Sequence, residues 1–128
     1  MLWILVLLGL VALCCLGFVF WSMRRRRLPA SMARELSLAW RQIEGTVDLH
    51  RRVIDAEKIL DRALAMLRYR GTFSEKLRVA GPRFSDVEAL WHAHKLRNRI
   101  AHEVNVSLDA REAERAVAAF KRGLDELM

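Results

Sequence analysis

The first 23 residues contain no Asp, Glu, Lys, Arg or His, and this constrains the chain more than any other feature. The segment reads MLWILVLLGLVALCCLGFVFWSM, from Met1 to Met23. An α-helix rises ~1.5 Å per residue, so a helix of this length spans a hydrocarbon layer of ~30 Å. Trp3 and Trp21 stand near its two ends, where indole rings favour the boundary between lipid and headgroups. The sequence therefore predicts a transmembrane helix over residues 1–23.

Four consecutive arginines, Arg24 to Arg27, follow this helix. Positive charge beside a membrane helix tends to stay on the cytoplasmic side, and only the amino terminus offers positive charge at the other end. We therefore expect a single-pass protein of the cell membrane, with its N-terminus outside and the rest of the chain in the cytoplasm. A cleaved signal peptide is the alternative, but such a peptide carries positive charge before its apolar stretch.

Two adjacent cysteines, Cys14 and Cys15, lie within the apolar segment, and the chain has 2 cysteines in all. A lipoprotein site would need a small residue where Leu13 stands, so we interpret them as small apolar residues of the helix. They provide neither a disulfide framework nor a cluster with zinc spacing. Neither a metal nor a cofactor is predicted.

The formal net charge of +7 has two sources. The run Arg24 to Arg27 supplies four positive charges, which membrane topology and anionic headgroups explain. The remaining excess is scattered over the predicted helix faces, where charge is usually solvated surface. Charge and hydropathy together thus predict the lipid bilayer as a partner, and they do not by themselves indicate a nucleic acid.

The chain after the arginine run is typical of helix throughout, without strand-like alternation. A basic linker over residues 24–31 ends at Ser31, the expected N-cap of the next helix. The first soluble segment runs from about residue 32 to about residue 70. Gly45 predicts a kink or break in it, because glycine weakens a helix interior and Thr46 can restart a helix.

Gly71 is the expected C-cap of this segment, and three capping-box patterns follow it. In such a box the first side chain accepts the amide of the fourth residue, whose side chain accepts the amide of the first. The boxes TFSE, SDVE and DARE predict helix starts at Thr72, Ser85 and Asp109. The predicted fold is all-α, a transmembrane helix followed by a cytoplasmic bundle of about four helices over residues 32–128. A bundle this small buries only ~60% of its unfolded surface, which favours a homodimer.

Two charged residues fall within the apolar faces of predicted helices. Glu57 lies in a stripe formed by Val53, Ala56, Leu60, Ala63, Leu64 and Leu67. Arg97 lies in an arc formed by Ala89, Leu90, Ala93, Leu96, Ile100 and Ala101. An arginine cannot shed its proton, so within an apolar face it needs a carboxylate, a phosphate or solvent. Glu57 is the expected ion-pair partner of Arg97.

Three further polar residues form one line along the same helix, because His94, Asn98 and His102 are spaced by four. The two histidines are ~12 Å apart along the helix axis, too far to share one metal ion. Two interpretations of the stretch from Lys95 to Glu103 stay open. The polar residues either tie helices together around an Arg97 ion pair or form a reactive site.

The stretch RNRIAH, Arg97 to His102, resembles the signature of HEPN domains, which are nucleotide-binding helical bundles. In that signature an arginine precedes a polar residue, often asparagine, and a histidine follows after a short spacer. The wider pattern, VIDAEKILDRAL, then GTFSEKL, ALWHAHKLRNRIAHE and DAREAERA, is similar to small membrane-anchored bacterial proteins of unknown function. The resemblance covers about residues 46–127.

This resemblance implies a homodimer in which two copies of the motif face each other, and metal-independent ribonuclease activity. His102 would be the acid or base acting on a ribose 2′-hydroxyl, Arg97 would stabilise charge on the phosphate, and Asn98 would orient one of them. His94 and Glu57 would support this set. Other HEPN-like domains are inactive binding or scaffold modules, so a non-catalytic domain with a protein partner stays open beside RNA or nucleotide binding.

Overall fold

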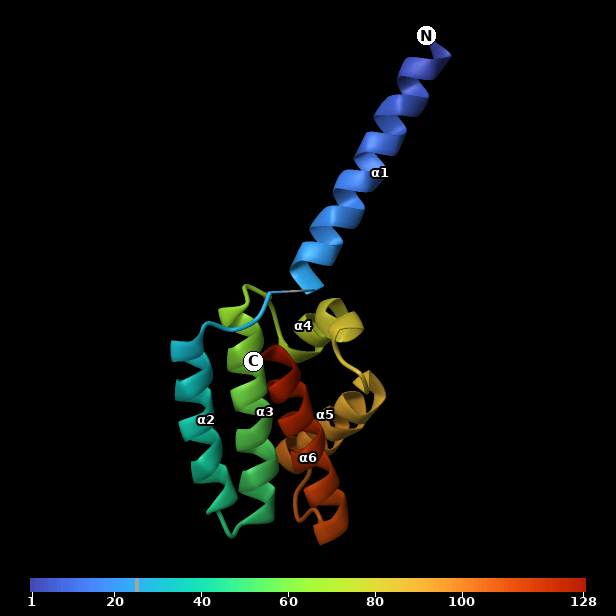
Figure 1. Ribbon diagram of the computed structural model, residues 1–128. Coiled ribbons are helices and arrows are strands. Elements are labelled where there is room, and N and C mark those ends of the chain that lie inside the picture. Colours follow the sequence, from blue (N-terminus) through green and yellow to red (C-terminus); the bar gives the residue numbers. More distant parts are fainter. Residues whose placement is uncertain (25) are drawn as a thin grey trace.

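The computed structural model describes residues 1–24 and 26–128, and these residues are almost entirely helical. Among them no strand occurs, so the all-α prediction is confirmed. Figure 1 shows α1 standing apart from a bundle that the other helices form. The elements are α1 (Leu2–Arg24), α2 (Ala30–Glu44), α3 (Leu49–Met66), α4 (Phe73–Ala80), the 3₁₀-helix η1 (Gly81–Arg83), α5 (Val87–His102) and α6 (Ala110–Leu127).

The first helix is long and apolar enough to cross a membrane. Its apolar stretch, Leu2–Ser22, has a mean hydropathy of 2.9, and none of it is buried against the rest of the protein. A core helix of a water-soluble bundle would be covered by its neighbours. α1 is therefore not part of the core.

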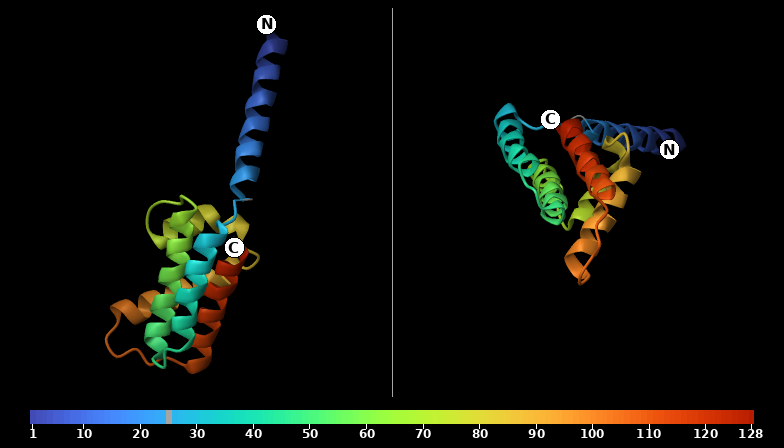
Figure 2. Two further views of the ribbon diagram at one scale, coloured as in Figure 1. Left: turned by 60° about the vertical axis from the view of Figure 1, so that its left-hand side comes forward. Right: turned by 90° about the horizontal axis from the view of Figure 1, so that it is seen from below.

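The break predicted at Gly45 is confirmed, but it separates two antiparallel helices instead of bending one. In Figures 1 and 2, α2 and α3 lie side by side and are joined by a short loop. Asp48, not Thr46, caps α3, because its carboxylate accepts the amides of His50 at 2.9 Å and Arg51 at 3.4 Å. The hydroxyl of Thr46 instead donates to a backbone carbonyl of α2. Within the described residues, the bundle after α1 consists of the α-helices α2 to α6 and the short η1.

The linker ends earlier than predicted. Pro29 occupies the N-cap position of α2 without a side-chain cap, so Ser31 lies inside the first turn and caps nothing. The fixed φ of proline suits the start of a helix. Leu28 is buried with 5% exposure, and its amide donates to the carbonyl of Leu127 at 2.9 Å. This hydrogen bond holds the end of the linker against the end of α6.

The capping box at Thr72 is confirmed. The Thr72 hydroxyl accepts the amide of Glu75 at 3.3 Å, and the Glu75 carboxylate accepts the amide of Thr72 at 2.7 Å. Gly71 is not the C-cap of the preceding helix, which already ends at Met66. Gly71 has a φ of 96° and a side chain there would collide with the Glu75 carboxylate. A glycine here lets the backbone adopt the conformation that leads into the capping box at Thr72.

The other two boxes differ from the prediction. Asp86 caps α5 by accepting the amide of Ala89 at 3.0 Å, while the amide of Ser85 donates to the Glu126 carboxylate of α6 at 3.1 Å. Asp109 caps α6 as predicted, accepting the amide of Arg111 at 3.3 Å. Glu112 does not complete a box at Asp109, because it pairs with an arginine of α5.

The core lies where α3, α5 and α6 meet, and α2 covers its side. The predicted stripe on α3 is buried, with Leu67 only partly so, while Ala101, predicted to lie in the apolar arc of α5, is exposed. A Cβ on Gly123 of α6 would lie 3.2 Å from Leu90 and 3.3 Å from Leu60. Glycine therefore lets α6 approach both neighbouring helices closely, and this packing fixes how α5 presents its polar residues.

Candidate functional site

Four polar side chains form a closed ring between α3 and α5, which we call the polar ring. Glu57 comes from α3, and His94, Arg97 and Asn98 come from α5. The Glu57 carboxylate lies 2.7 Å from His94 Nδ1 and 3.1 Å from Arg97 Nε. Asn98 closes the ring, with its Nδ2 3.1 Å from His94 Nε2 and its Oδ1 accepting from Arg97 Nη1 at 3.2 Å. The predicted ion pair between Glu57 and Arg97 is present, and His94 is a second partner of the same carboxylate.

The directions of the hydrogen bonds show which ring nitrogen of His94 carries the hydrogen. Arg97 can only donate, so Asn98 accepts through Oδ1 and its amide group Nδ2 donates to His94 Nε2. Nε2 of the imidazole is then an acceptor, and Nδ1 carries the hydrogen that Glu57 accepts. The self-consistent state is a neutral His94 beside an ionised Glu57, whose charge Arg97 balances.

Burial sets the electrostatics of the polar ring. The side chains of Glu57 and His94 are 6% and 14% exposed. Burial raises the pKa of Glu57 above 4.5, and the charge of Asp61 raises it further, while the hydrogen bond from His94 and the charge of Arg97 offset only part of this shift. The ionised carboxylate is therefore costly to bury even with its partners, and losing one partner would leave it uncompensated.

Arg97 is held less completely than Glu57. Its Nε lies within ion-pair distance of Glu57, but the N–H does not point at an acceptor, and 27% of the side chain is exposed. The polar ring borders a cleft of about 390 Å³ between α3, the start of α4 and α5. Phe73 closes one side and packs on the His94 ring with a centroid distance of 5.1 Å. A ligand in this cleft would meet Arg97 and Asn98.

His102 does not join the polar ring. It is the last residue of α5 and is exposed, and within the described part of the chain nothing forms a hydrogen bond or ion pair with its side chain. It follows Asn98 by four residues, ~6 Å along the helix. The structure therefore brings together four of the five predicted site residues and leaves His102 one turn away with its imidazole open to solvent.

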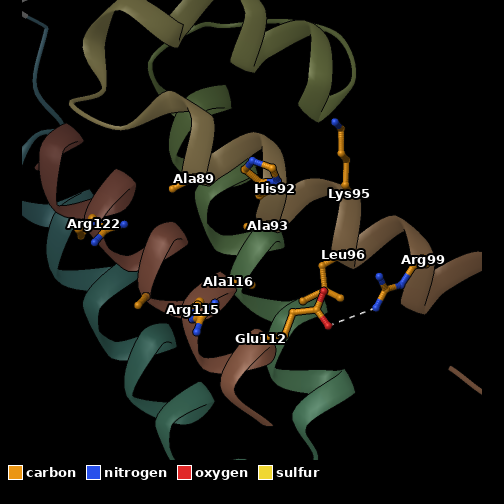
Figure 3. A pocket seen from close by; sticks show the side chains of 11 residues that line it. Ala89, His92, Ala93, Lys95, Leu96, Arg99, Glu112, Arg115, Ala116 and Arg122 are labelled. Carbon is orange, nitrogen blue, oxygen red and sulfur yellow. Dashed lines mark hydrogen bonds and ion pairs between the residues drawn. The ribbon is translucent and has the colours of Figure 1, made fainter. Parts of the chain in front are cut away.

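A second cavity, of about 640 Å³, lies between α5 and α6, and we call it the basic groove (Figure 3). Small side chains such as Ala93 and Ala116 leave room along its floor. Its charged lining consists of His92, Lys95, Arg99, Arg115, Arg122 and the single acid Glu112. The sequence predicted scattered surface charge, but the packing of α5 against α6 gathers it.

Two of the cations in the basic groove are already paired. Arg99 Nη2 lies 3.3 Å from the Glu112 carboxylate, the contact dashed in Figure 3, and Arg122 lies 3.7 Å from Asp86. Lys95 and Arg115 form no ion pair with any residue that the structure describes. The groove therefore has a net positive charge that is available to an anion.

Metal coordination has no set of ligands in the described chain. Within residues 1–24 and 26–128, no group of three or more His, Cys, Asp or Glu side chains is placed to hold a metal ion.

The comparisons with other proteins place no further constraint on this arrangement. No protein-family model matches the chain, and no curated protein or solved structure matches it. The class of protein is therefore defined by the structure alone. It is a helical bundle preceded, in the described residues, by one helix that is long and apolar enough to cross a membrane. The resemblance to HEPN domains, carried by residues 97–102 and by the wider pattern over about residues 46–127, therefore stays a prediction.

Proposed function

We propose that this protein is a single-pass membrane protein whose cytoplasmic bundle binds single-stranded RNA in the basic groove. The observation that carries this proposal is the collection of five basic side chains, with one acid, around a groove with an alanine floor. Lys95 and Arg99 lie one helical turn apart, and Arg115 and Arg122 lie on the facing helix. Phosphates along a flexible strand could contact both rows, and such contacts supply most sequence-independent affinity.

Membrane anchoring is the first part of the proposal. The apolar stretch Leu2–Ser22 supports it, as does the arginine run that follows. A reporter fused after Met128 should behave as cytoplasmic, because the arginines resist translocation. Replacing Arg24 to Arg27 by glutamine should mix the two orientations. Digestion of the bundle by external protease in sealed cells would contradict the N-out topology.

Cleavage of the bound RNA without a metal is the catalytic form of the proposal. His102 is exposed, lies one turn beyond Asn98 and three residues after Arg99 of the groove, and has no competing partner among the described residues. An imidazole so placed can take a proton from a ribose 2′-hydroxyl or return one to a leaving oxygen. Arg97 faces the cleft beside α3, on the other side of α5 from the basic groove, so it would stabilise charge on the phosphate only if the strand continues around the end of α5 at His102. A homodimer would bring a second His102 to the same strand.

A non-catalytic interaction module is the second candidate. It is favoured by the polar ring, in which Asn98 already uses both ends of its amide and Arg97 already serves Glu57. Groups that satisfy one another stabilise the contact between α3 and α5 and need no substrate. In this form the protein would bind RNA or a protein partner at the membrane without a chemical reaction on either.

RNA binding is tested with the full chain in lipid nanodiscs. The double variant Lys95→Gln/Arg115→Gln should bind single-stranded RNA more weakly, and the slope of its salt dependence should be flatter by ~0.7 for each phosphate that is no longer neutralised. The matched control Arg34→Gln/Arg41→Gln removes the same charge from exposed positions on α2 and should bind like the parent. Equal affinity of both double variants would contradict binding in the basic groove.

Cleavage is tested in the same nanodiscs with RNA and a chelator. The parent should cut the strand, and His102→Ala should retain binding while losing cleavage, because it removes a proton donor and acceptor and no phosphate contact. A parent that binds RNA as a dimer without cutting it would eliminate the ribonuclease form and leave the interaction module.

A further inference from the structure

The two ends of the bundle differ in charge. Figures 1 and 2 place the loop between α3 and α4 at the end from which α1 leaves, and the loop between α2 and α3 at the opposite end. At the opposite end, residues 45–48 and 103–109 contain acids but no lysine or arginine. At the end near α1, residues 26–29, 67–72 and η1 contain no acid and five arginines, namely Arg26, Arg27, Arg68, Arg70 and Arg83. We call this end the basic end.

The basic end is tied close to the place where α1 would enter the membrane. Arg83 Nη2 donates to the carbonyl of Arg26, and the amide of Leu28 donates to Leu127. Leu28 follows the end of α1 at Arg24 so closely that the chain between them spans at most ~14 Å when fully extended. The headgroup layer beyond the hydrocarbon core is itself ~5 to 8 Å thick. The basic end therefore cannot move far from the lipid headgroups if α1 spans the bilayer.

A cleft at this end is shaped by an unusual turn. The chain leaves α3 with Arg68 at a φ of 70°, and Gly71 has a φ of 96°. The turn borders a cavity of about 470 Å³ together with Tyr69, Arg70 and Lys76. The left-handed conformation is strained for an arginine, so contacts with the rest of the protein must stabilise this turn. Hydrogen bonds from the amides of residues 68 and 69 back to α3 are among these contacts.

The charge of this cleft is unbalanced. Arg68 and Arg70 are exposed and form no ion pair with any residue in the described ranges. Lys76 is nearly buried, and its ammonium group lies 2.9 Å from the Asp61 carboxylate, which balances it. The acids Glu75 and Glu126 at the same end are engaged by Thr72 and Ser85. Two arginines thus remain for an external anion.

We propose that the cleft of Arg68 and Arg70 binds the phosphoryl headgroup of an anionic phospholipid and so seats the bundle on the bilayer. This assignment rests on the membrane anchoring proposed above. An arginine guanidinium matches two phosphate oxygens at once, and basic groups beside a membrane helix are drawn to anionic headgroups. This contact with the headgroups would be a second point of attachment beside α1. It would stop the bundle from rotating about its linker and would hold the basic groove in one orientation relative to the membrane.

The test compares amide hydrogen exchange of residues 67–72 in the full chain, inserted into nanodiscs of phosphatidylcholine alone or with phosphatidylglycerol. We expect exchange to be several-fold slower with the anionic lipid, because a bound headgroup stabilises the turn against local opening. Arg68→Gln/Arg70→Gln should remove the difference. The control Arg41→Gln/Arg111→Gln, which removes the same charge from exposed positions in the helical turns next to the opposite end, should keep it.

Three outcomes would overturn the assignment, each in a distinct way. Equal exchange in the two kinds of nanodisc, with the chain inserted, would exclude headgroup binding while leaving the anchoring intact. Equal protection by inorganic phosphate in phosphatidylcholine nanodiscs would identify a soluble anion as the ligand. Extraction of the chain from vesicles by alkaline carbonate would refute the anchoring, and the headgroup site with it.

Discussion

Two strips of α5 carry similar residues but differ in what surrounds them. His94, Arg97 and Asn98 face α3 and the cleft beside it, where Glu57 gathers them into the polar ring. His92, Lys95 and Arg99 border the basic groove on the other side of the helix, and His102 extends into solvent. Packing, and not residue type, therefore decides whether a charged side chain stabilises the fold or stays available to a ligand.

The largest effect is expected for Arg97→Ala, because Arg97 belongs to the buried polar ring. Removing the guanidinium leaves the Glu57 carboxylate buried beside a neutral histidine, and breaking a buried pair in this way costs ~3 kcal/mol or more. Chemical denaturation of the full chain in detergent, followed by circular dichroism, measures the decrease in stability.

Arg99→Ala is the matched control for this experiment. Arg99 lies two residues away on the same helix, and it pairs with Glu112 at the surface, where both side chains are more than 40% exposed. Such surface pairs contribute about 0 to 1 kcal/mol. Equal destabilisation by the two variants would mean that the two strips do not differ.

An intermediate effect is expected from pH and Glu57→Gln. Burial raises the pKa of Glu57, so the folded state holds this proton more tightly than the unfolded state. The stabilising contribution is then complete below the unfolded pKa of about 4.5 and is lost as pH rises through the folded pKa. The stability of the parent minus that of Glu57→Gln should therefore fall as pH rises above about 4.5 and through the raised pKa of Glu57.

Denaturation curves for both proteins at several pH values measure this difference. Titrations elsewhere in the chain cancel in the subtraction if they are unchanged by the substitution. A difference that rises with pH would show that the partners of Glu57 outweigh its burial, and the polar ring would then stabilise the ionised carboxylate outright.

The smallest effect is expected for His102→Ala, about 1 kcal/mol or less. His102 is exposed at the end of its helix and has no partner among the described residues, so its loss leaves nothing buried and unpaired. Thermal melting of the variant beside the parent gives the comparison. A decrease as large as that of Arg97→Ala would reveal a structural role for His102, such as one across a homodimer.

Much of this arrangement could be predicted from local patterns. Glu57 and Arg97 are each a charged residue in the apolar face of a predicted helix. Two buried charges of opposite sign are expected to form an ion pair. The box at Thr72 needs only residues within one turn. Helix positions alone also place His94 one turn from Asn98.

The remaining features depend on contacts between distant segments. Ser85 does not form a capping box on α5, because its hydroxyl and its amide both donate to the carboxylate of Glu126, 41 residues further on. The basic groove exists because α6 packs against α5, and periodicity within either helix cannot show which cations will face each other. The hydrogen bond of His94 to Glu57 likewise requires the relative rotation of α3 and α5, which the packing of the core decides.

The close packing of α6 at Gly123 also has a consequence for the order of events during synthesis. α6 meets α3 and α5 there, so the core cannot close until this last helix has been made. α1 precedes every other helix in the chain and would engage lipid first. Contacts between segments so far apart in sequence also form slowly. If α1 spans a bilayer as proposed, the bundle completes its folding while attached to the membrane, with its uncovered apolar faces close to the membrane surface.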